Sequence, residues 1–270
     1  MSESDKVFVG SIPEIYDTYL VPLIFEAFAN DLAERVAALD PATILETAAG
    51  SGVVTRALTS RLSSDAHYTV TDLNQPMLDH AASKQEPDSR ILWRQADALN
   101  LPFDDESFDA VVCQFGVMFF PDRVAGYAEA RRVLKPGGTL LFNVWDDIGS
   151  NEFADVVTET AAAVFPDDPP QFLPRTPYGY HEEDLIRQEL SQAGFLDVTY
   201  ETLVEKSSAP SPRHAAFAYC QGTPLRNEIE ARDANLLDDV TDRAEEAIAS
   251  RYGAGPVTAK IQGHIITAVR

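Results

Sequence analysis

Long apolar runs are missing from this 270-residue chain. Its longest apolar stretches, Tyr19 to Phe25 and Val111 to Phe120, are interrupted by polar residues or fall far short of the roughly 20 residues that a membrane-spanning helix needs. The first residues, Met1 to Lys6, also lack the basic and then apolar order of a secretory signal. We therefore expect a cytoplasmic protein with no stable membrane insertion.

Signatures of metal binding and of nucleophilic catalysis are missing too. The two cysteines, Cys113 and Cys220, are too far apart to suggest a zinc site, and no histidine pair has the His-x-x-x-His spacing of metal ligands. The chain contains neither a serine nucleophile elbow nor the Asn-Pro-Pro-Tyr signature of DNA amino-methylating enzymes. We expect no metal in the functional site.

Basic residues are scarce. The chain has 21 Lys and Arg against 43 Asp and Glu, which gives a formal net charge of -22. A surface of this charge repels a nucleic-acid backbone, so DNA and RNA are not expected as partners. The acidic, lysine-poor balance would also suit a salt-rich cytoplasm, and biased genomic composition would explain it equally well.

A hydrophobic content of 45% allows a full core, and the apolar segments alternate between two periods. Five short strand-like runs are separated by helical patterns, and they are Thr43–Leu45, Tyr68–Thr71, Ile91–Gln95, Phe108–Cys113 and Thr139–Trp145. Such alternation predicts an α/β fold with a parallel, doubly wound sheet. Ligands of such sheets bind outside the carboxyl ends of the strands.

The rest of the chain predicts additions to this core. We expect a helical segment over residues 1–40, a cofactor-binding core over 41–150, and the remainder of the sheet over 151–270. The last part contains two further strands, Phe195–Ser207 and Thr258–Val269, which could pair antiparallel at the sheet edge. A helical insertion at about 210–252 separates them, and we expect it to bind substrate.

The segment Glu46–Gly52 joins the first predicted strand to a helix. Its glycines allow a tight turn and a close approach to a ligand. A dinucleotide fingerprint would have a third glycine where Thr55 stands, and the Gly-Lys-Ser/Thr of a phosphate-binding Walker loop is absent. The carboxylate of Glu46 fits a cationic ligand group better than a pyrophosphate.

Polar residues follow the next strands at the same edge. Asp72 ends the second strand, Ala96-Asp97-Ala98 follows the third, and Gln114 follows the fourth. In isolation, an Asp at a strand end is more often a helix cap or turn residue. The ordered set favours a ligand site, although NAD enzymes place an acid similarly, so a nicotinamide-dependent oxidoreductase remains an alternative.

The loop Glu46–Gly52, Asp72, Asp97, Phe108–Val112 and Leu134–Gly138 resemble class I S-adenosylmethionine-dependent methyltransferases of the ubiquinone/menaquinone-biosynthesis type, with a type 11-like methyltransferase domain. The resemblance covers about residues 40–146. It implies a mostly parallel seven-stranded Rossmann-like sheet with helical lid insertions, S-adenosylmethionine as cofactor and S-adenosylhomocysteine as product. We assign Leu134–Gly138 to a helix stop and a tight turn before the fifth strand.

The resemblance also implies roles for residues. The first loop would wrap the methionine part of the cofactor, Asp72 would hold the ribose, and Asp97 would contact the adenine amine. The implied cofactor site consists of Glu46, Thr47, Ala48, Gly50, Gly52, Asp72, Leu73, Met77, Ala96, Asp97, Ala98 and Gln114. Tyr16 and Tyr19 resemble an aromatic lid, and ordinary helix packing is the equal alternative for them.

One position departs from the family pattern. Ala48 occupies the first glycine position of the loop, and we expect it to be tolerated if its φ angle is negative.

The reaction we expect is direct in-line transfer of a methyl group to a small-molecule acceptor. Such a reaction does not require a catalytic base, because positioning alone lowers the barrier. His181 and His214 are the weak candidates for a base, with helix capping as the alternative for His181. A non-catalytic S-adenosylmethionine-binding module is a further alternative. The sequence leaves the acceptor, its oxygen, nitrogen, carbon or sulfur nucleophile, and the oligomeric state open.

Overall fold

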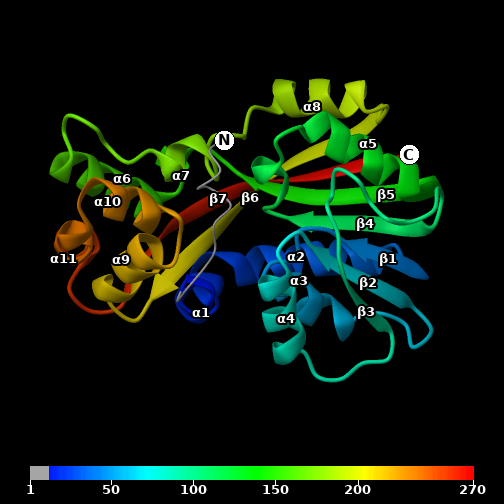
Figure 1. Ribbon diagram of the computed structural model, residues 1–270, viewed down its shortest axis with the longest axis horizontal. Helices are drawn as coiled ribbons and strands as arrows, with labels where there is room; N and C mark the ends of the chain where they lie inside the picture. Colours follow the sequence, from blue (N-terminus) through cyan, green and yellow to red (C-terminus); the bar gives the residue numbers. More distant parts are fainter. Residues whose placement is uncertain (1–11) are drawn as a thin grey trace. The chain divides into compact units, whose positions relative to one another are not determined.

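The computed structural model describes residues 12–270. Its strands form one seven-stranded sheet in the order β3-β2-β1-β4-β5-β7-β6 (Figure 1). The strands are β1 (Thr43–Glu46), β2 (His67–Asp72), β3 (Ile91–Gln95), β4 (Phe108–Gln114), β5 (Leu134–Trp145), β6 (Asp197–Ala209) and β7 (Val257–Val269). The predicted α/β class and mostly parallel seven-stranded sheet are confirmed.

The strands β1 to β5 are parallel, and β1 lies between β2 and β4. Glu46, the last residue of β1, is in register with Val70 of β2 and with Val112 of β4. The chain therefore builds outward from β1 in one direction through β2 and β3, and in the other through β4 and β5. The carboxyl ends of β1 and β4 mark this reversal, where open α/β sheets bind their ligands.

The last two strands reverse direction. Near the start of β5, the Gly137 N–H donates to the carbonyl of Arg270. Just beyond the end of β5, the Asp146 N–H donates to the carbonyl of Gln262, which precedes Arg270 in the chain. β7 is therefore antiparallel to β5. Side-chain contacts between β6 and β7 show the same reversal, because Thr202 contacts His264 whereas the later residue Ser208 contacts Thr258. The edge pairing expected from the sequence is present.

The described chain clusters into two compact units. The core unit comprises Ala27–Val144, His181–Thr202 and His264–Arg270, and the helical unit comprises the described residues up to Glu26 with Trp145–Tyr180 and Leu203–Gly263. The division predicted at residues 40 and 150 differs from these bounds, because the long strands β6 and β7 each contribute residues to both units. We keep that division as a proposal about function.

Helices of the core unit cover its part of the sheet. They are α2 (Glu26–Ala38), α3 (Val53–Thr59), α4 (Gln75–Lys84), α5 (Arg123–Val133), α8 (Glu183–Gln192) and the 3₁₀ turn η3 (Val117–Phe119). Leu32 of α2, Leu58 of α3 and Leu78 of α4 pack with the buried side chains of β1, β2 and β4. This packing fixes the strand ends, from which the site loops extend.

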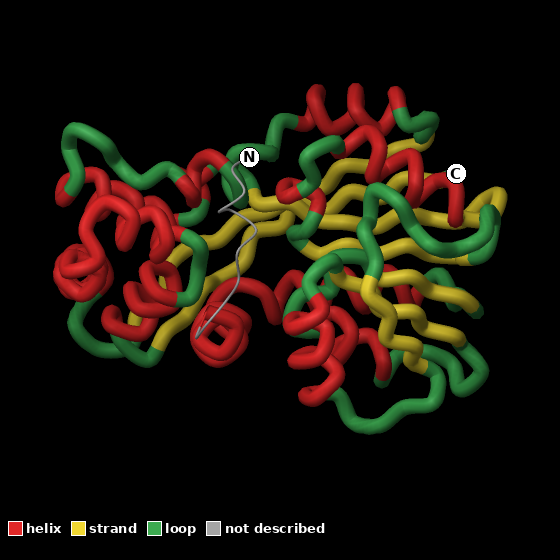
Figure 2. The backbone as a smooth tube through the Cα atoms, viewed as in Figure 1, coloured by secondary structure: helices red, strands yellow, loops and turns green. Residues whose placement is uncertain are grey.

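The helical unit contains the segment in which an insertion was predicted (Figure 2). Its elements are α1 (Ile12–Ile15), η2 (Tyr16–Phe25), η4 (Ile148–Ser150), α6 (Glu152–Val164), α7 (Phe172–Arg175), α9 (Pro212–Gln221), α10 (Leu225–Asp233), η5 (Ala234–Leu236) and α11 (Leu237–Tyr252). η2 is a π-helix with Pro22 inside it. Since proline has no N–H to donate, regular α-helical bonding is interrupted there. Among residues 12–270, none of the helices combines the length and the hydropathy of a transmembrane helix.

One local prediction was partly wrong. The helix stop predicted at Leu134–Gly138 is present, because α5 ends at Val133 with Leu134 as its C-cap. The turn is not separate from the strand, because Leu134 already pairs with Phe108 in β5 and the register shifts before Ala110 pairs with Thr139. Gly138 permits this irregular pairing, since a Cβ there would lie 2.9 Å from the carbonyl oxygen of Lys135. The proline-rich segment 166–177 contains the short helix α7.

Candidate functional site

The loop between β1 and α3 turns back through left-handed backbone conformations. The φ angles of Ala48, Gly50 and Gly52 are 52°, 57° and 79°. Two backbone hydrogen bonds hold the loop to the neighbouring strands, from Thr47 N–H to the Val112 carbonyl (2.9 Å) and from Ala49 N–H to the Thr71 carbonyl (3.0 Å). The loop is therefore fixed at the carboxyl ends of β1, β2 and β4, where the sequence places it.

Ala48 does not meet the condition under which we expected it to be tolerated. Its φ angle is positive, a conformation that costs an L-residue roughly 1–2 kcal/mol relative to the right-handed one. The structure makes room for the methyl group at Gly116, since a Cβ on Gly116 would lie only 2.6 Å from the Cβ of Ala48. Ala48 is thus accommodated in space while remaining strained in the backbone.

Asp72 connects the first loop to the end of β2. The residue is 6% exposed, its Oδ2 accepts the Gly50 N–H at 2.8 Å, and its Oδ1 accepts the Asn74 N–H at 2.7 Å. Burial raises the pKa of this carboxyl, and the backbone hydrogen bonds oppose the rise. Each carboxylate oxygen retains lone-pair capacity for a further donor such as a ribose hydroxyl.

Glu46 is the more buried acid of the site. The residue is 1% exposed, and its Oε2 accepts hydrogen bonds from Thr55 Oγ1 (2.6 Å) and from the Tyr68 hydroxyl. Burial raises the pKa of the Glu46 carboxyl to about 7, against the lowering effect of both hydroxyl donors. Sequence reasoning missed both partners. The signal was a tyrosine in β2, a strand that otherwise contains two threonines, one valine and two titratable residues.

Open space borders the loop at Gly50. A Cβ on Gly50 would have a single neighbour within 4 Å, the Cε of Met77 at 4.0 Å. Leu73, the residue after β2, is 49% exposed although it is apolar. The apolar Met77 side chain beside an open glycine and the exposed Leu73 at the end of β2 suit an adenine ring, and the Asp72 carboxylate bonded to Gly50 suits a ribose. The residues present therefore fit an adenosine-containing cofactor.

Asp97 forms a turn after β3. The Ala96 N–H donates to the Asp72 carbonyl at 3.1 Å, which brings the end of β3 beside β2. Asp97 is exposed, and its Oδ1 accepts the Leu99 N–H at 2.9 Å. This is the turn role that a lone strand-end Asp usually has, and Oδ2 remains for a ligand. The adenine contacts assigned to Asp97 and the half-buried Ala98 stay predictions.

A second strained residue follows β4. Gln114 is half-buried at the strand end, and the next residue, Phe115, has a φ angle of 47°. Asn143 of β5 stabilises that conformation, because its Oδ1 accepts the Phe115 N–H at 2.9 Å. The Nδ2 of Asn143 is buried without a hydrogen-bond partner among the described residues. Sequence reasoning missed Asn143, a lone asparagine within the apolar run of β5.

The predicted lid tyrosines pack within the helical unit. The Tyr19 ring centroid lies 4.9 Å from that of His214 and 5.0 Å from that of Phe217 in α9, and Tyr16 packs against Phe25 at 5.2 Å. These contacts are the ordinary packing that was the equal alternative. A role in closing over a cofactor stays a prediction.

The two candidate bases belong to different compact units. His214 is in the helical unit, and His181 is in the core unit with its Nε2 3.2 Å from Glu182 Oε1. The Tyr200 hydroxyl donates to the carbonyl of His181 at 2.8 Å. A base role for either histidine stays a prediction.

Comparisons with known proteins agree on the cofactor-binding segment. Residues 45–142 match the family model described as a methyltransferase domain. A demethylmenaquinone methyltransferase of Clavibacter sepedonicus is 28% identical over 194 residues, which make up 64% of this chain and 76% of that protein. The matched domain contains the glycine loop, Asp72, Asp97 and Gln114.

Solved structures share the fold over most of the chain. A Bacillus halodurans protein superposes with a TM-score of 0.57 at 18% identity, over 89% of this chain and 97% of that one. A phosphoethanolamine N-methyltransferase of Haemonchus contortus, solved with S-adenosylhomocysteine, has a TM-score of 0.54 at 18% identity and covers 97% of this chain and 60% of that one.

Proposed function

Because the chain is an S-adenosylmethionine-dependent methyltransferase, we propose that it binds this cofactor at the carboxyl ends of β1, β2 and β4 and methylates a small-molecule acceptor. The observation that carries the site is the Asp72 carboxylate. It is buried at the end of β2, it accepts the Gly50 N–H of the first loop, and it keeps lone pairs for a ligand.

The residues of the site have separate tasks in this proposal. Asp72 accepts hydrogen bonds from the ribose hydroxyls, and Met77 and Leu73 contact the adenine ring. The exposed Asp97 accepts from the adenine amine through its free oxygen. The backbone of Gly50 and Gly52 allows the methionine part to approach the loop closely, since neither residue carries a Cβ.

When bound, S-adenosylmethionine supplies an electrophilic methyl group that passes in line to the acceptor. The chain's share is to orient the two partners and exclude water, and alignment of this kind can be worth roughly 7–11 kcal/mol. A catalytic base is not needed when the acceptor is already an anion or a neutral amine, because no proton has to leave it before the methyl group is transferred. His181 and His214 are the residues to test if the acceptor must also lose a proton.

The acceptor is a small molecule in this proposal, and the similarity to a demethylmenaquinone methyltransferase makes a quinol the first compound to assay. The net charge of -22 argues against a nucleic-acid substrate. We also propose that the protein acts in the cytoplasm. Formation of S-adenosylhomocysteine that depends on an added quinol supports this acceptor class, and turnover only with amines or thiols contradicts it.

The cofactor site is tested by calorimetric titration of S-adenosylhomocysteine into Asp72→Ala. We expect affinity to fall by about 1–3 kcal/mol, because ribose hydroxyls would lose a buried partner. Asp79→Ala is the matched control, since Asp79 is an exposed acid of α4 in the same unit, and its affinity should equal that of the wild type. An unchanged dissociation constant in Asp72→Ala would remove this residue from the site.

A further inference from the structure

Two residues that are not glycine have left-handed backbone conformations beside the proposed cofactor site. The φ angle is 52° at Ala48 and 47° at Phe115. Gly116 brings the two positions together, because a Cβ added to it would lie 2.6 Å from the Cβ of Ala48. The first loop, Glu46–Gly52, therefore rests on the turn that follows β4. The contact between Ala48 and Gly116 is one of packing, so it depends on the backbone conformation of that turn.

Asn143 of β5 holds the second of these left-handed residues. The Phe115 N–H is shared between two acceptors of Asn143, the side-chain Oδ1 at 2.9 Å and the backbone carbonyl at 3.2 Å. A phenylalanine needs such support, because the left-handed conformation is unfavourable for an L-residue. Gln114, the predicted cofactor contact just before the turn, pairs in register with Asn143. One side chain of β5 thus fixes the backbone that follows Gln114 and leads to Gly116.

The Asn143 side chain is unfavourable for the fold in another respect. Asn143 is 0% exposed and lies between the buried residues Phe142 and Val144. Because Oδ1 faces the Phe115 N–H, Nδ2 points away from it, and there Nδ2 has no hydrogen-bond partner among residues 12–270. A buried amide donor without a partner destabilises a protein, and an apolar side chain of similar size would avoid this. Among the described residues, only the Phe115 N–H donates to this side chain.

We propose that Asn143 is a positioning residue for the cofactor. By holding Phe115 in the left-handed conformation, it keeps Gly116 against Ala48 and so keeps the first loop in the conformation that binds. This inference rests on the proposed function, which places the methionine part of the cofactor at that loop. A loop that is ordered before the ligand arrives loses less conformational freedom on binding, and its affinity is higher for that reason.

The first loop is then held from two sides. From β2, the Asp72 carboxylate accepts the Gly50 N–H at 2.8 Å, and from β5, Asn143 acts through the turn after β4. If Phe115 relaxed to a right-handed conformation, the peptide that follows it would rotate, and the support of the loop on this side would be lost. Binding of the cofactor would then have to order the loop, which lowers the affinity.

The experiment is calorimetric titration of S-adenosylhomocysteine into variants of the full chain. Asn143→Leu keeps the approximate volume and removes the acceptor, so affinity should fall by about five- to tenfold, the factor that corresponds to one lost hydrogen bond. Asn143→Asp removes Nδ2 and keeps an oxygen where Oδ1 stands. Its affinity should therefore stay within about twofold of the wild type. If Asn143→Leu does not fold, as judged by circular dichroism, Asn143→Ala takes its place.

Phe142→Leu is the matched control for loss of packing. It truncates a buried neighbour in β5 that packs on Tyr127 of α5, and it leaves the bond to Phe115 in place. It should lower the denaturation midpoint without changing the affinity for S-adenosylhomocysteine. A purely structural role of Asn143 would make Asn143→Leu behave in the same way as Phe142→Leu.

A double-mutant cycle with Phe115→Gly tests the route through the turn. Glycine adopts the left-handed conformation without steric cost, so the support from Asn143 matters less when glycine stands at position 115. The loss of affinity caused by Asn143→Leu should therefore shrink to less than about twofold in the Phe115→Gly background. Fully additive effects of the two substitutions would overturn the inference.

The remaining outcomes distinguish the inference from the function beneath it. Wild-type affinity in Asn143→Leu would overturn the inference and leave the proposed cofactor site intact. Equal losses in Asn143→Leu and Asn143→Asp would overturn it as well, because Nδ2 would then be the group that matters. The absence of any binding of S-adenosylhomocysteine to the wild type would contradict the proposed function itself.

Discussion

Ala48 and Glu46 both occupy positions that disfavour their own residue type. Ala48 has a left-handed φ of 52°, and Glu46 is an acidic residue that is only 1% exposed. Phe115, after β4, is left-handed as well. Strained backbone and buried charge of this kind gather at ligand sites, where surrounding structure holds them in place. All three residues flank the strand ends at which we place the cofactor.

Ala48→Gly should stabilise the protein. The substitution relieves a left-handed cost of roughly 1–2 kcal/mol and adds about 0.5–1 kcal/mol of chain entropy to the unfolded state, so the expected gain is about 0.5–1 kcal/mol. Denaturant unfolding measures it. Ala128→Gly is the control, at an exposed position inside α5, and should cost about 1 kcal/mol. The same sign in both variants would contradict the strain at Ala48.

Gly116→Ala tests the space that accommodates Ala48. The added Cβ would lie 2.6 Å from the Cβ of Ala48 and 2.7 Å from the Sγ of Cys113, so we expect a loss of about 1–3 kcal/mol. Part of this loss should be recovered when Gly116→Ala is combined with Ala48→Gly, because the nearer obstacle is removed. Additive effects in this double-mutant cycle would show that the two residues do not share the space.

Glu46→Gln should change how stability depends on pH. The folded-state pKa of about 7 lies above the unfolded value of 4.5, so between these values the native state holds a proton that the unfolded state has lost. Wild-type stability therefore falls as pH rises through this window, by about 3 kcal/mol in total. Glu46→Gln lacks this contribution and should gain on the wild type from pH 5 to pH 8.

The control for this measurement is Glu34→Gln, at an exposed position of α2. Its stability relative to the wild type should stay constant across the same pH range. A Glu46→Gln variant that also keeps a constant difference would show that the Glu46 carboxyl is not perturbed by burial.

Single residues of the site were predictable where a local sequence pattern, such as a strand end or a glycine turn, points to them. Asp72 and Gly50 follow from a strand end and a tight turn, and the structure joins them by a hydrogen bond. Tyr68 and Asn143 were not predicted, because a polar residue inside an apolar strand does not reveal which neighbour it faces. The sign of the φ angle at Ala48 could not be predicted either, since it depends on the hydrogen bonds that hold the whole loop to β2 and β4.

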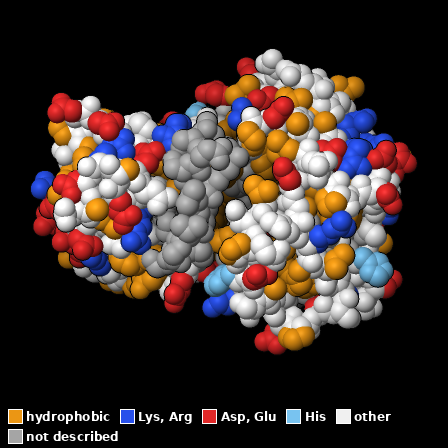
Figure 3. Space-filling model, in the orientation of Figure 1, with side chains coloured by type: hydrophobic (Ala, Val, Ile, Leu, Met, Phe, Trp, Pro, Cys, Tyr) orange, Lys and Arg blue, Asp and Glu red, His pale blue; other side chains and the backbone are white. Residues whose placement is uncertain are grey.

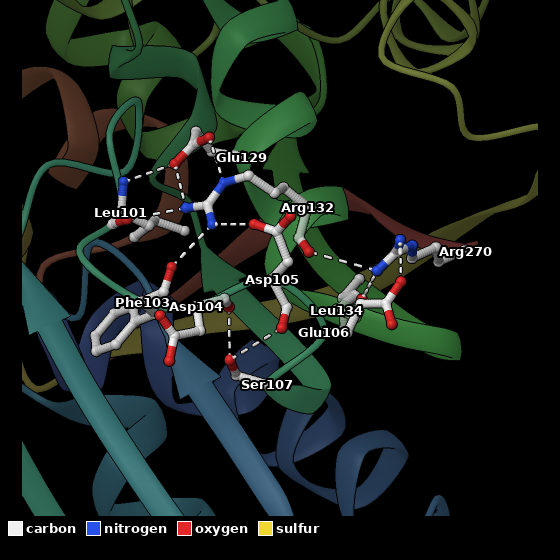
Figure 4. A network of polar contacts seen from close by, with 10 residues as sticks. All are labelled: Leu101, Phe103, Asp104, Asp105, Glu106, Ser107, Glu129, Arg132, Leu134 and Arg270. Carbon is white, nitrogen blue, oxygen red and sulfur yellow. Dashed lines mark hydrogen bonds and ion pairs between the residues drawn. The ribbon is translucent and has the colours of Figure 1, made fainter.

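At the scale of elements, Arg132 fastens the connection between β3 and β4 to α5 (Figure 4). Its guanidinium donates to the carbonyls of Leu101 (2.9 Å) and Phe103 (2.8 Å). It also donates to the carboxylates of Glu129 and Asp105 at 2.8 Å. All five N–H donors of the Arg132 guanidinium are used. The loop that begins at Asp97, the predicted adenine contact, is therefore held to α5 at Leu101, Phe103 and Asp105.

Arg132→Lys should loosen this connection. An ammonium group keeps the charge but cannot reproduce the planar fork, so two carbonyls and a carboxylate lose partners and stability should fall by about 1–3 kcal/mol. Hydrogen exchange should quicken over residues 99–107. Arg131→Lys, whose Nε bonds the Gly194 carbonyl, is the neighbouring control and should change stability by less than about 0.5 kcal/mol. Equal effects in the two variants would contradict the anchoring role.

Most elements were predictable from periodicity, and the exceptions have local causes. The bounds of β3 match the predicted range, because the strand-like run ends there at polar residues. The start of β5 at Leu134 could not be predicted from the sequence pattern. Lys135, at the start of that strand's pairing with β4, forms an ion pair with Asp109 at 2.8 Å, and the pattern does not reveal this contact. That contact joins two of the motifs on which the family resemblance rests, and it serves the fold.

At the scale of the whole molecule, the dominant property is negative charge. The formal net charge is -22, and acidic side chains are spread over the face drawn in Figure 3 with basic ones among them. Self-repulsion of this size destabilises a compact state and is screened by salt. The sequence alone predicts this behaviour, because it depends on composition and only weakly on where each charge lies.

Added KCl should therefore raise the melting temperature at pH 7. The rise should be steepest below about 0.5 M, where screening of exposed charges changes most. The same titration closer to the isoelectric point of about 4.4 should give a smaller rise, since fewer acids are ionised. A melting temperature that does not increase with KCl at pH 7 would show that self-repulsion is unimportant and would count against adaptation to a salt-rich cytoplasm.

The central claim is that the carboxyl ends of β1, β2 and β4 bind S-adenosylmethionine and not a nicotinamide dinucleotide. Calorimetric titration of the full chain with S-adenosylhomocysteine and, separately, with NAD tests it most directly. The account predicts saturable binding of S-adenosylhomocysteine and no heat of binding with NAD. Tight binding of NAD with no response to S-adenosylhomocysteine would contradict it.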